Sequence, residues 1–479
     1  MSWQPFQTRP SRRDFLCESY LGLGGLAALD LLARDVRATA ANNPLMVKPA
    51  HLPGQAKRCI FLFMEGGVSQ MDTFEYVPAL EKLDGKRMPT SRDTTGAVGQ
   101  IGTGPNQVIA SPYKFARHGE SGHWMSELFP HLSTRVDDLA WIHGIELGSS
   151  NHGPAVYHAL TGHMQPGSPS VGSWVTYGLG SENQNLPGFV VVGQGAPAIG
   201  GAAQWGNGFL PASYQGTLFR NGPTPIVNLN PQAGQSLDRQ RQELDLLRWL
   251  NERHAAQRTA TSELEGRIAA YEVAYKMQTE APDLIDISDE SNATRSLYGI
   301  DQPDTDTFGR QCLLARRMVE RGVRFVKLLH RRGKPWDQHG GIKSKLPRLC
   351  REVDQPITGL LHDLRSRGLL EDTLVVWASE MGRTPWDSNL TQRSDPGRDH
   401  NNYALVMWMA GGKVRGGASY GKPDEWSLRS TDEHVHIRDV HATLLHLMGL
   451  DQDALTYLHA GRSERLTVFG GRVIREILA

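Results

Sequence analysis

The sequence predicts an α/β fold in which a doubly wound, mostly parallel sheet carries helices on both faces. Short apolar runs, each about as long as one strand, alternate with segments of helical periodicity. The runs are apolar along their whole length, which is typical of strands buried on both faces of a sheet. The segments between them are long enough to hold the helices that connect parallel strands.

The first apolar run covers residues 58–64 and ends at Glu-Gly-Gly. Similar runs follow along the chain at 188–192, 323–329, 373–378 and 404–410, with helical patterns at 308–321 and 353–367. This alternation predicts parallel strand pairing, with ligand-binding loops at the carboxyl ends of the strands. Residues 235–279 are rich in Gln, Glu, Arg, Leu and Ala and predict one or two long, solvated helices. Together with the acidic loop at 281–293 they form a helical insertion at about 235–295.

Residues 1–40 have the features of a twin-arginine signal peptide. Arg12 and Arg13 precede Phe15-Leu16 and a weakly apolar, glycine-rich run at 20–33. That run contains Asp30 and is too short to span a bilayer, so we expect no permanent membrane anchor. An Ala-Thr-Ala sequence places the cleavage site near residue 40. We therefore expect the twin-arginine translocation machinery to export a folded protein to the periplasm or out of the cell.

The rest of the chain divides into a polar linker at 41–57 and one large domain at 58–479. Its three cysteines are too few, and odd in number, for a fully paired disulfide framework: Cys59, Cys312 and Cys350. This composition agrees with folding in a reducing compartment before export. The 51 basic and 51 acidic side chains give a formal net charge of zero. That balance gives no reason to expect a nucleic acid as partner.

Residue types that bind metals follow or precede several of the predicted strands. They are Glu65, Ser69 and Asp72 after the first run, His330, Asp337 and His339 after the third, Ser379 and Glu380 after the fourth, and Asp399 and His400, which Arg398 precedes, before the fifth. Because a doubly wound sheet brings such strand ends to one edge, we expect a metal site formed by Asp72, Asp337, His339, Glu380 and His400. Mixed imidazole and carboxylate ligands would suit Zn²⁺ or Mn²⁺, whereas mostly carboxylate ligands would suit Ca²⁺ or Mg²⁺.

A loop of small residues at 149–154 leads into a predicted helix at 155–160. Free N–H groups and the positive end of the helix dipole at such a loop favour an anion, such as a phosphate or sulfate ester. In that interpretation Asn151 and Ser69 contact the substrate, and Arg383 and Arg398 neutralise its charge. A simple capped helix explains the loop equally well.

Several motifs resemble those of the alkaline phosphatase and sulfatase superfamily. Residues 159–163 (Ala-Leu-Thr-Gly-His) are similar to the helix end that follows a sulfatase nucleophile, 379–382 (Ser-Glu-Met-Gly) to its metal-binding turn, and 436–445 to its closing helix. The export signal, together with 66–74, 336–340, 379–385 and 397–400, resembles more specifically a large family of exported bacterial proteins often described as sulfatase-like, the domain of unknown function 1501. This resemblance covers nearly the whole chain.

The resemblance implies a metal-dependent hydrolase of sulfate or phosphate esters, with Zn, Mn or Ca as the divalent metal and a small molecule or a polysaccharide as the substrate. The sequence departs from the superfamily at the nucleophile, because the Cys/Ser-x-Pro-x-Arg motif is missing and His152 occupies the corresponding position. His152 is then a metal ligand, a nucleophile or an acid, unless Ser149, Ser150 or Thr161 supplies a hydroxyl. In the metal-binding turn, Glu380 replaces Asp and Met381 replaces His or Asn.

Two other functions stay open. The missing nucleophile motif favours a non-catalytic protein of the same fold that recognises an anionic polysaccharide or a partner protein. The same metal site could also serve a different reaction, such as that of a phosphomutase or a lyase, because one fold supports many chemistries.

Overall fold

The computed structural model describes residues 43–53, 56–89, 107–194, 199–222, 225–226, 229, 236–255, 262–386, 394–431 and 434–479. The predicted signal peptide, including Arg12 and Arg13, lies outside the described residues and stays a prediction.

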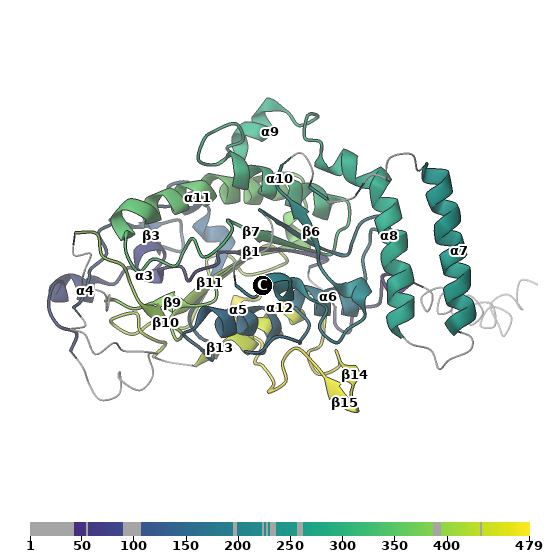
Figure 1. The fold of residues 1–479 in the computed structure, drawn as a ribbon. Helices are drawn as coiled ribbons and strands as arrows, with labels where there is room; N and C mark the ends of the chain where they lie inside the picture. Colours follow the sequence, from purple (N-terminus) through teal and green to yellow (C-terminus); the bar gives the residue numbers. More distant parts are fainter. Residues whose placement is uncertain are drawn as a thin grey trace, which may run out of the picture.

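Within the described residues a nine-stranded sheet forms the centre of the domain (Figure 1). The strands follow the order β12-β4-β11-β8-β1-β7-β5-β6, and β13 also pairs with β4. From β8 to β6 all neighbours are parallel, whereas β11 runs antiparallel to both β8 and β4. The strands are β1 (Arg58–Phe63), β4 (Leu139–Glu146), β5 (Phe189–Gly193), β6 (Thr217–Arg220), β7 (Phe325–Leu329), β8 (Thr373–Ala378), β11 (Leu405–Ala410), β12 (Ser419–Tyr420) and β13 (Val435–His436).

Helices cover both faces of this sheet, so the predicted fold class is confirmed (Figure 1). Successive residues of β1 enter two different hydrophobic cores, Ile60 and Leu62 on one face and Phe61 and Phe63 on the other. The first core is covered by α10 (Asp306–Glu320) and α11 (Ile342–Ser366), and the second by α5 (His152–Thr161), α6 (Val171–Leu179) and α12 (Ile437–Leu447). Burial on both faces explains why these strands are apolar throughout.

The predicted apolar runs became β1, β5, β7, β8 and β11, with shifts of one or two residues at their ends. Helix α11 begins eleven residues before the predicted start, and it contains Pro347 and Pro356. The sequence prediction missed β4, which His143 and Gly144 interrupt. This strand pairs with the antiparallel β11, so one end of the sheet departs from the parallel pattern.

Smaller elements surround the central layers. Helices α7 (Leu237–Ala255) and α8 (Ser262–Ile285) lie side by side beyond the β6 edge of the sheet, joined by an ion pair from Arg241 to Glu272 (Figure 1). The others are α3 (Gln70–Thr73), α4 (Pro78–Leu83), α9 (Asn292–Leu297) and three strand pairs, β2 (Phe115–His118) with β3 (His123–Ser126), β9 (Gly382–Arg383) with β10 (His400–Asn401), and β14 (Tyr457–His459) with β15 (Arg462–Glu464).

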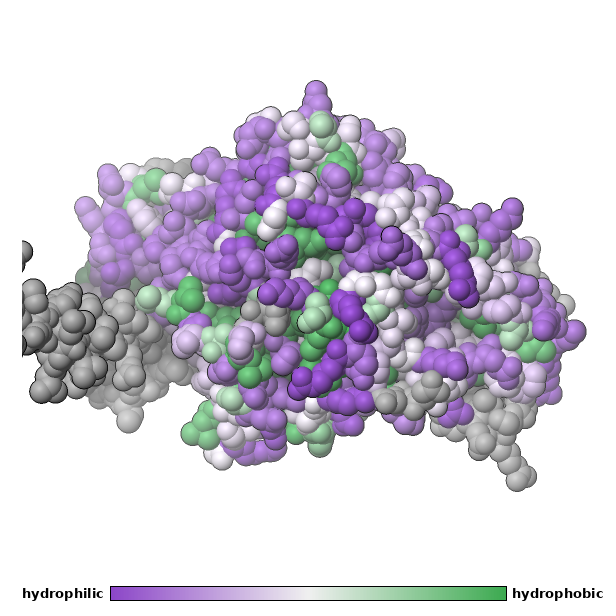
Figure 2. Space-filling view, turned by 180° about the vertical axis from the view of Figure 1, so that it is seen from behind, coloured by the Kyte–Doolittle hydropathy of each residue, from purple (hydrophilic) through white to green (hydrophobic). Residues whose placement is uncertain are grey.

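One face of the molecule is largely polar. Figure 2 shows a predominantly hydrophilic face on which the hydrophobic residues form small, separate groups. Among the described helices, none is both long and apolar enough to cross a membrane. The three described cysteines, Cys59, Cys312 and Cys350, are buried free thiols.

Candidate metal centre

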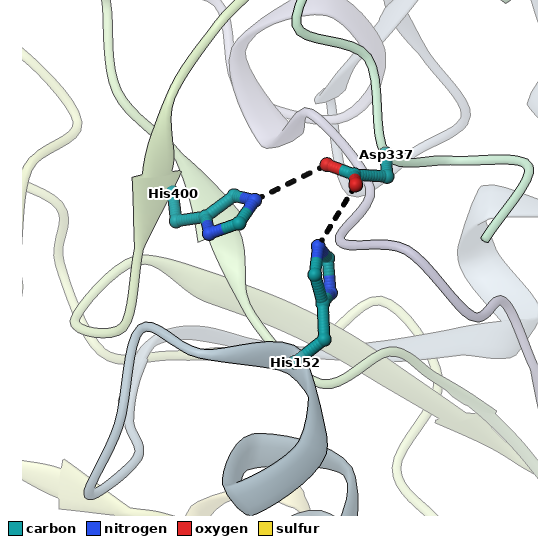
Figure 3. Close-up of side chains that lie close together, drawn as sticks. All are labelled: His152, Asp337 and His400. Carbon is teal, nitrogen blue, oxygen red and sulfur yellow. Dashed lines mark hydrogen bonds and ion pairs between the residues drawn. The ribbon is translucent and has the colours of Figure 1, made fainter. Parts of the chain in front are cut away.

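Three side chains from distant parts of the chain meet at the carboxyl edge of the sheet (Figure 3). His152 begins α5, Asp337 lies in the loop after β7, and His400 lies on β10. The Nε2 atoms of His152 and His400 are each 3.1 Å from one oxygen of the Asp337 carboxylate. One ligand atom from each residue lies within 4.8 Å of the others, a spacing at which all three could bind one ion.

Backbone packing holds the Asp337 loop against the first strand. Gly66 directly follows Glu65 after β1 and has a φ of +124°, which side chains rarely tolerate. A Cβ at this position would lie 2.4 Å from the backbone nitrogen of Asp337. Glycine therefore lets the Asp337 loop and the β1 loop approach each other closely.

The short β9–β10 ladder places His400 beside Arg383, its partner in the antiparallel register. The Arg383 guanidinium donates to the Asp337 carboxylate at 2.8 Å, and also to the carbonyl oxygens of Gly66, Gly67, Trp336 and Arg398. Arg383 thus ties the β1 loop, the Asp337 loop and the β10 region together. It is 1% exposed, and these contacts already occupy its donors.

Each histidine is oriented through its other ring nitrogen. His152 Nδ1 lies 2.7 Å from Glu380 Oε1, and His400 Nδ1 lies 2.8 Å from the carbonyl oxygen of Ser150. A carbonyl only accepts, so the Nδ1 of His400 carries the proton and its Nε2 presents a lone pair when the ring is neutral. His152 Nε2 is buried and has no well-aligned hydrogen bond among the described residues. Such partners behind the imidazoles are typical of metal-binding histidines.

The Asp337 carboxylate lies among cationic and imidazole groups. Burial alone would raise its pKa, but the contacts with His152 and His339 and the charge of Arg383 hold the pKa of Asp337 far below its ordinary value. The Lys334 ammonium lies 2.8 Å from its Oδ2 atom. Asp337 is therefore ionised at neutral pH.

The pKa values of the three histidines are shifted in different directions. Hydrogen bonds to Asp337 and then to Asp399 raise the pKa of His339 to about 9. Burial lowers the pKa of His400. Burial would also lower the pKa of His152, but its hydrogen bonds to Asp337 and Glu380 raise it overall. His400 is consequently neutral at pH 7, and the half-exposed His339 is cationic.

These residues fit a divalent metal. Two imidazole nitrogens and one carboxylate oxygen form a ligand set of the kind that Zn²⁺ accepts in catalytic sites, which keep a further position open. Mn²⁺ also accepts mixed ligands of this type, whereas Ca²⁺ prefers oxygen ligands alone. The buried Nε2 of His152, which lies 3.1 Å from Asp337 without a well-aligned hydrogen bond, is the polar atom that such an ion would satisfy.

Several predicted ligands have other contacts. Asp72 is fully buried and forms a bidentate ion pair with Arg398, at 2.6 and 3.0 Å, while Ser69 donates to it at 2.6 Å. Glu380 accepts from the backbone nitrogen of Gly66 and contacts His152 Nδ1, so it orients a ligand from behind. The structure brings together His152, Asp337, His339 and His400, and places Asp72, Ser69 and Arg398 in a separate buried cluster.

The remaining predicted residues are distributed as follows. Asn151 is exposed at the N-cap of α5, beside His152, without a side-chain cap bond. His330 is buried next to Trp336, whose indole donates to it at 3.2 Å, and it contacts Glu352 instead of the metal-binding group. Ser379 donates to the carbonyl oxygen of Met64 at 2.7 Å.

Sequence reasoning missed Lys334, and it also missed Lys327 and Gln204, which form a buried polar group with Glu65. Lys327 is 2% exposed, and its Nζ atom lies 2.9 Å from the side-chain oxygen of Gln204. The same Gln204 donates to Glu65 at 3.1 Å. Burial lowers the pKa of Lys327 and raises that of Glu65. A lysine inside an otherwise apolar strand was the signal for this group.

Comparison with known proteins identifies the family. The family described as "Protein of unknown function (DUF1501)" matches residues 56–478. A search of curated proteins finds no match.

Solved structures show only distant likenesses. A phosphonate monoester hydrolase of Agrobacterium radiobacter is 10% identical, with 88% of this chain and 77% of that chain covered and a TM-score of 0.35. The TAB5 alkaline phosphatase is 11% identical, with 84% of this chain and 100% of that chain covered and a TM-score of 0.34. The PsFucS1 sulfatase from Pseudoalteromonas sp. is 11% identical, with 82% of this chain and 68% of that chain covered and a TM-score of 0.31. The family match, which spans nearly the whole described domain, is the finding that classifies the protein, and the chain belongs to the DUF1501 family.

Proposed function

We propose that this protein is an exported, divalent-metal-dependent hydrolase of phosphate or sulfate esters. The observation that carries the proposal is the convergence of His152, Asp337 and His400, with each imidazole held through Nδ1 so that Nε2 faces the carboxylate. This arrangement costs free energy of folding, because it removes ionisable groups from water at the edge of the sheet. Its position, where loops from β1, β7 and β10 meet, is where α/β sheets bind their ligands.

A bound metal ion at these three residues would polarise an ester oxygen and lower the pKa of a bound water. In this proposal the attacking group is water and not the hydroxyl of Ser69 or Ser379, because these two hydroxyls already have partners. Ser69 donates to Asp72, and Ser379 donates to the Met64 carbonyl. His152, at the position where the superfamily places its nucleophile, is held between Glu380 and Asp337 and serves as a ligand in this proposal.

In this proposal the positive charges that contact the substrate belong to partly exposed side chains beside Asp337. Arg383 and Arg398 are buried, and their donors are used within the protein. The side chains of Lys334 and His339 are about two-fifths exposed and contact Asp337 from the solvent side. The raised pKa of His339 keeps its ring cationic at neutral pH. Lys334 and His339 are placed to bind the anionic group, and His339 to donate a proton to the leaving oxygen.

Metal analysis of the full chain tests the proposal. We expect about one Zn or Mn ion per chain for a His₂Asp centre, and a loss of most of this metal in His152→Ala and in His400→Ala. His434→Ala is the matched control, because His434 is highly exposed and lies outside the metal centre. A wild-type protein that folds without metal, and gains none when dialysed against Zn²⁺ or Mn²⁺, would refute the metal centre.

Activity is tested separately with p-nitrophenyl phosphate, bis(p-nitrophenyl) phosphate and p-nitrophenyl sulfate. Hydrolysis of at least one ester by the metal-loaded wild type should fall by roughly 100-fold or more in His400→Ala, because the metal supplies most of the activation. If the metal binds but the wild type hydrolyses no ester faster than His400→Ala does, the proposed hydrolase function is wrong. The non-catalytic binding protein is then the better interpretation.

The export part of the proposal rests on the sequence of residues 1–40. Replacement of both Arg12 and Arg13 by lysine should retain the full-length precursor in the cytoplasm of a host with a twin-arginine pathway. Equal amounts of processed protein outside the cytoplasm for the variant and the wild type would contradict a twin-arginine route.

A further inference from the structure

Helix α7 carries an unusual share of the exposed apolar side chains of this protein. Ten large hydrophobic residues are exposed in the described part of the chain, and five of them lie on this helix. They are Leu237, Leu246, Leu247, Trp249 and Leu250, each between 45% and 57% exposed. Single exposed apolar residues are normal on a protein surface, whereas a group of them on one element marks an interaction surface.

The side of α7 that packs on α8 is polar. The Arg241 guanidinium lies 2.8 Å from the Glu272 carboxylate, and Arg248 pairs with the same carboxylate. These three charged side chains are each less exposed than the apolar residues of the helix, except that Arg248 is 40% exposed. The contact between the two helices therefore depends on ion pairs and leaves the apolar residues of α7 uncovered.

The opposite side of α7 carries an apolar stripe. Because an α-helix has about 3.6 residues per turn, positions three and four apart lie on one side. Leu246, Trp249 and Leu250 are spaced in this way, and we call them the α7 stripe. A surface helix normally turns its apolar side inward and its polar side outward. α7 does the reverse at the outermost position beyond α8, which indicates that another surface covers the stripe (Figure 1).

Charged residues of both signs border the stripe. Glu243 and Asp245 stand before it and are 50% and 57% exposed, and Arg239 is paired with Glu243. After the stripe, the Arg253 guanidinium lies 5.4 Å from the centre of the Trp249 ring. A helix that binds an anionic membrane carries mainly Lys and Arg beside its apolar side. The mixed border instead favours a protein partner with charges of both signs.

The order of these residues is complementary to itself when two helices run antiparallel. Two copies related by a two-fold axis contact each other reciprocally. If Leu246 packs on the partner's Leu250, Glu243 meets the partner's Arg253, because both pairs are symmetric about position 248. One antiparallel register thus covers the stripe and pairs the charges beside it. A parallel pairing in register would bring like charges together at both ends.

We propose that the α7 stripe is a dimer interface, on which the α7 helix of a second copy packs in antiparallel orientation. Leu246 and Leu250 form its apolar centre, and Trp249 supplies the large aromatic area that is typical of interface residues with a strong effect on binding. The proposal does not depend on ester hydrolysis, because no residue of α7 belongs to the metal centre.

Sedimentation velocity of the full chain tests the proposal. We expect a dimer with a Kd below about 10 μM. Leu246→Lys should raise this Kd by about tenfold or more, because it places a charge in the apolar centre of the interface. Leu458→Lys is the matched control, since Leu458 is an exposed leucine on β14, outside α7. Both leucines are exposed, so both variants should keep the melting temperature of the metal-bound monomer.

Charge exchange tests the antiparallel register. Glu243→Arg and Arg253→Glu should each weaken the dimer by about fivefold, because like charges then meet at two symmetric positions. The double variant Glu243→Arg/Arg253→Glu should recover most of the wild-type affinity, since each position again meets an opposite charge. A double variant that dimerises no better than the single variants would overturn the proposal.

Two other results would also overturn it. One is a wild-type chain that stays monomeric at about 100 μM, and the other is a dimer whose Kd is the same in Leu246→Lys. Co-sedimentation of a monomeric wild type with vesicles of phosphatidylglycerol and phosphatidylcholine, lost in Leu246→Lys, would assign the stripe to a membrane surface instead of a second copy.

Discussion

The buried ion pair between Asp72 and Arg398 gives a direct test of which acidic residues hold the metal. Both oxygens of Asp72 accept from the Arg398 guanidinium, and the two side chains are at most 1% exposed. Arg398 also donates to the carbonyl oxygen of Ile109 at 2.9 Å, and Ser69 donates to Asp72. Asp72 is not one of the residues of the His152–Asp337–His400 group.

Replacing Asp72 by Asn should destabilise the protein strongly. The substitution removes the charge that compensates Arg398, and breaking a buried pair from one side costs about 3–5 kcal/mol. The desolvated guanidinium keeps its charge, because the pKa of arginine is too high for it to lose a proton. In the double variant Asp72→Leu/Arg398→Met both charges are absent, so most of this loss should be recovered.

Chemical unfolding and metal analysis together decide whether Asp72 is the ion-pair partner of Arg398 or a metal ligand. We expect Asp72→Asn to unfold at a lower denaturant concentration and to keep the metal content of the wild type at temperatures where it is folded. His400→Ala should show the reverse pattern, with lost metal and a smaller change in stability measured without metal. A stable Asp72→Asn protein without metal would refute the assignment and restore Asp72 as a ligand.

Two further substitutions test the geometry. Gly66→Ala should lose metal and about 2 kcal/mol of stability or more, because Gly66 has a positive φ and the new Cβ would collide with the backbone of Asp337. Gly153→Ala is the control, because a Cβ at Gly153 meets only open space. Equal metal contents in the two variants would contradict the packing argument. Burial lowers the pKa of His441 to about 4 from its ordinary value of 6.5. The unfolded chain then binds this proton at a higher pH than the folded one, so acidification from pH 7 to pH 5 should remove about 2 kcal/mol of stability. His441→Gln should lose about that much less over the same interval in unfolding titrations at the two pH values, and an unchanged pH dependence would count against a neutral, buried His441.

The sequence was most informative where burial alone determines the residue types. Strands of the parallel region, such as Thr373–Ala378, are buried on both faces, so their apolar runs were readable without any contact information. The strand Leu139–Glu146 was missed because it carries His143, whose ring contacts the buried carboxylate of Glu75 at 2.7 Å. A polar residue satisfied by a distant partner breaks the apolar pattern without breaking the strand.

The candidate site was only partly predictable, because residue type does not reveal a partner. Asp72 and Asp337 both follow buried strands in glycine-containing loops, and no sequence feature ranks one above the other as a metal ligand. Arg398, 326 positions along the chain, neutralises Asp72, whereas Asp337 lies among three imidazoles. The export signal stays a prediction because it lies outside the described residues.

In our proposal His152 acts as a metal ligand and not as a nucleophile. Its imidazole is held by Glu380 at Nδ1 and by Asp337 at Nε2, which fixes the orientation of the ring. Glu380 can hold it because its carboxylate both accepts from the Gly66 backbone nitrogen and reaches His152. A ring fixed in this way suits a metal ligand, and the attacking group is then water, so that no covalent intermediate forms on a side chain.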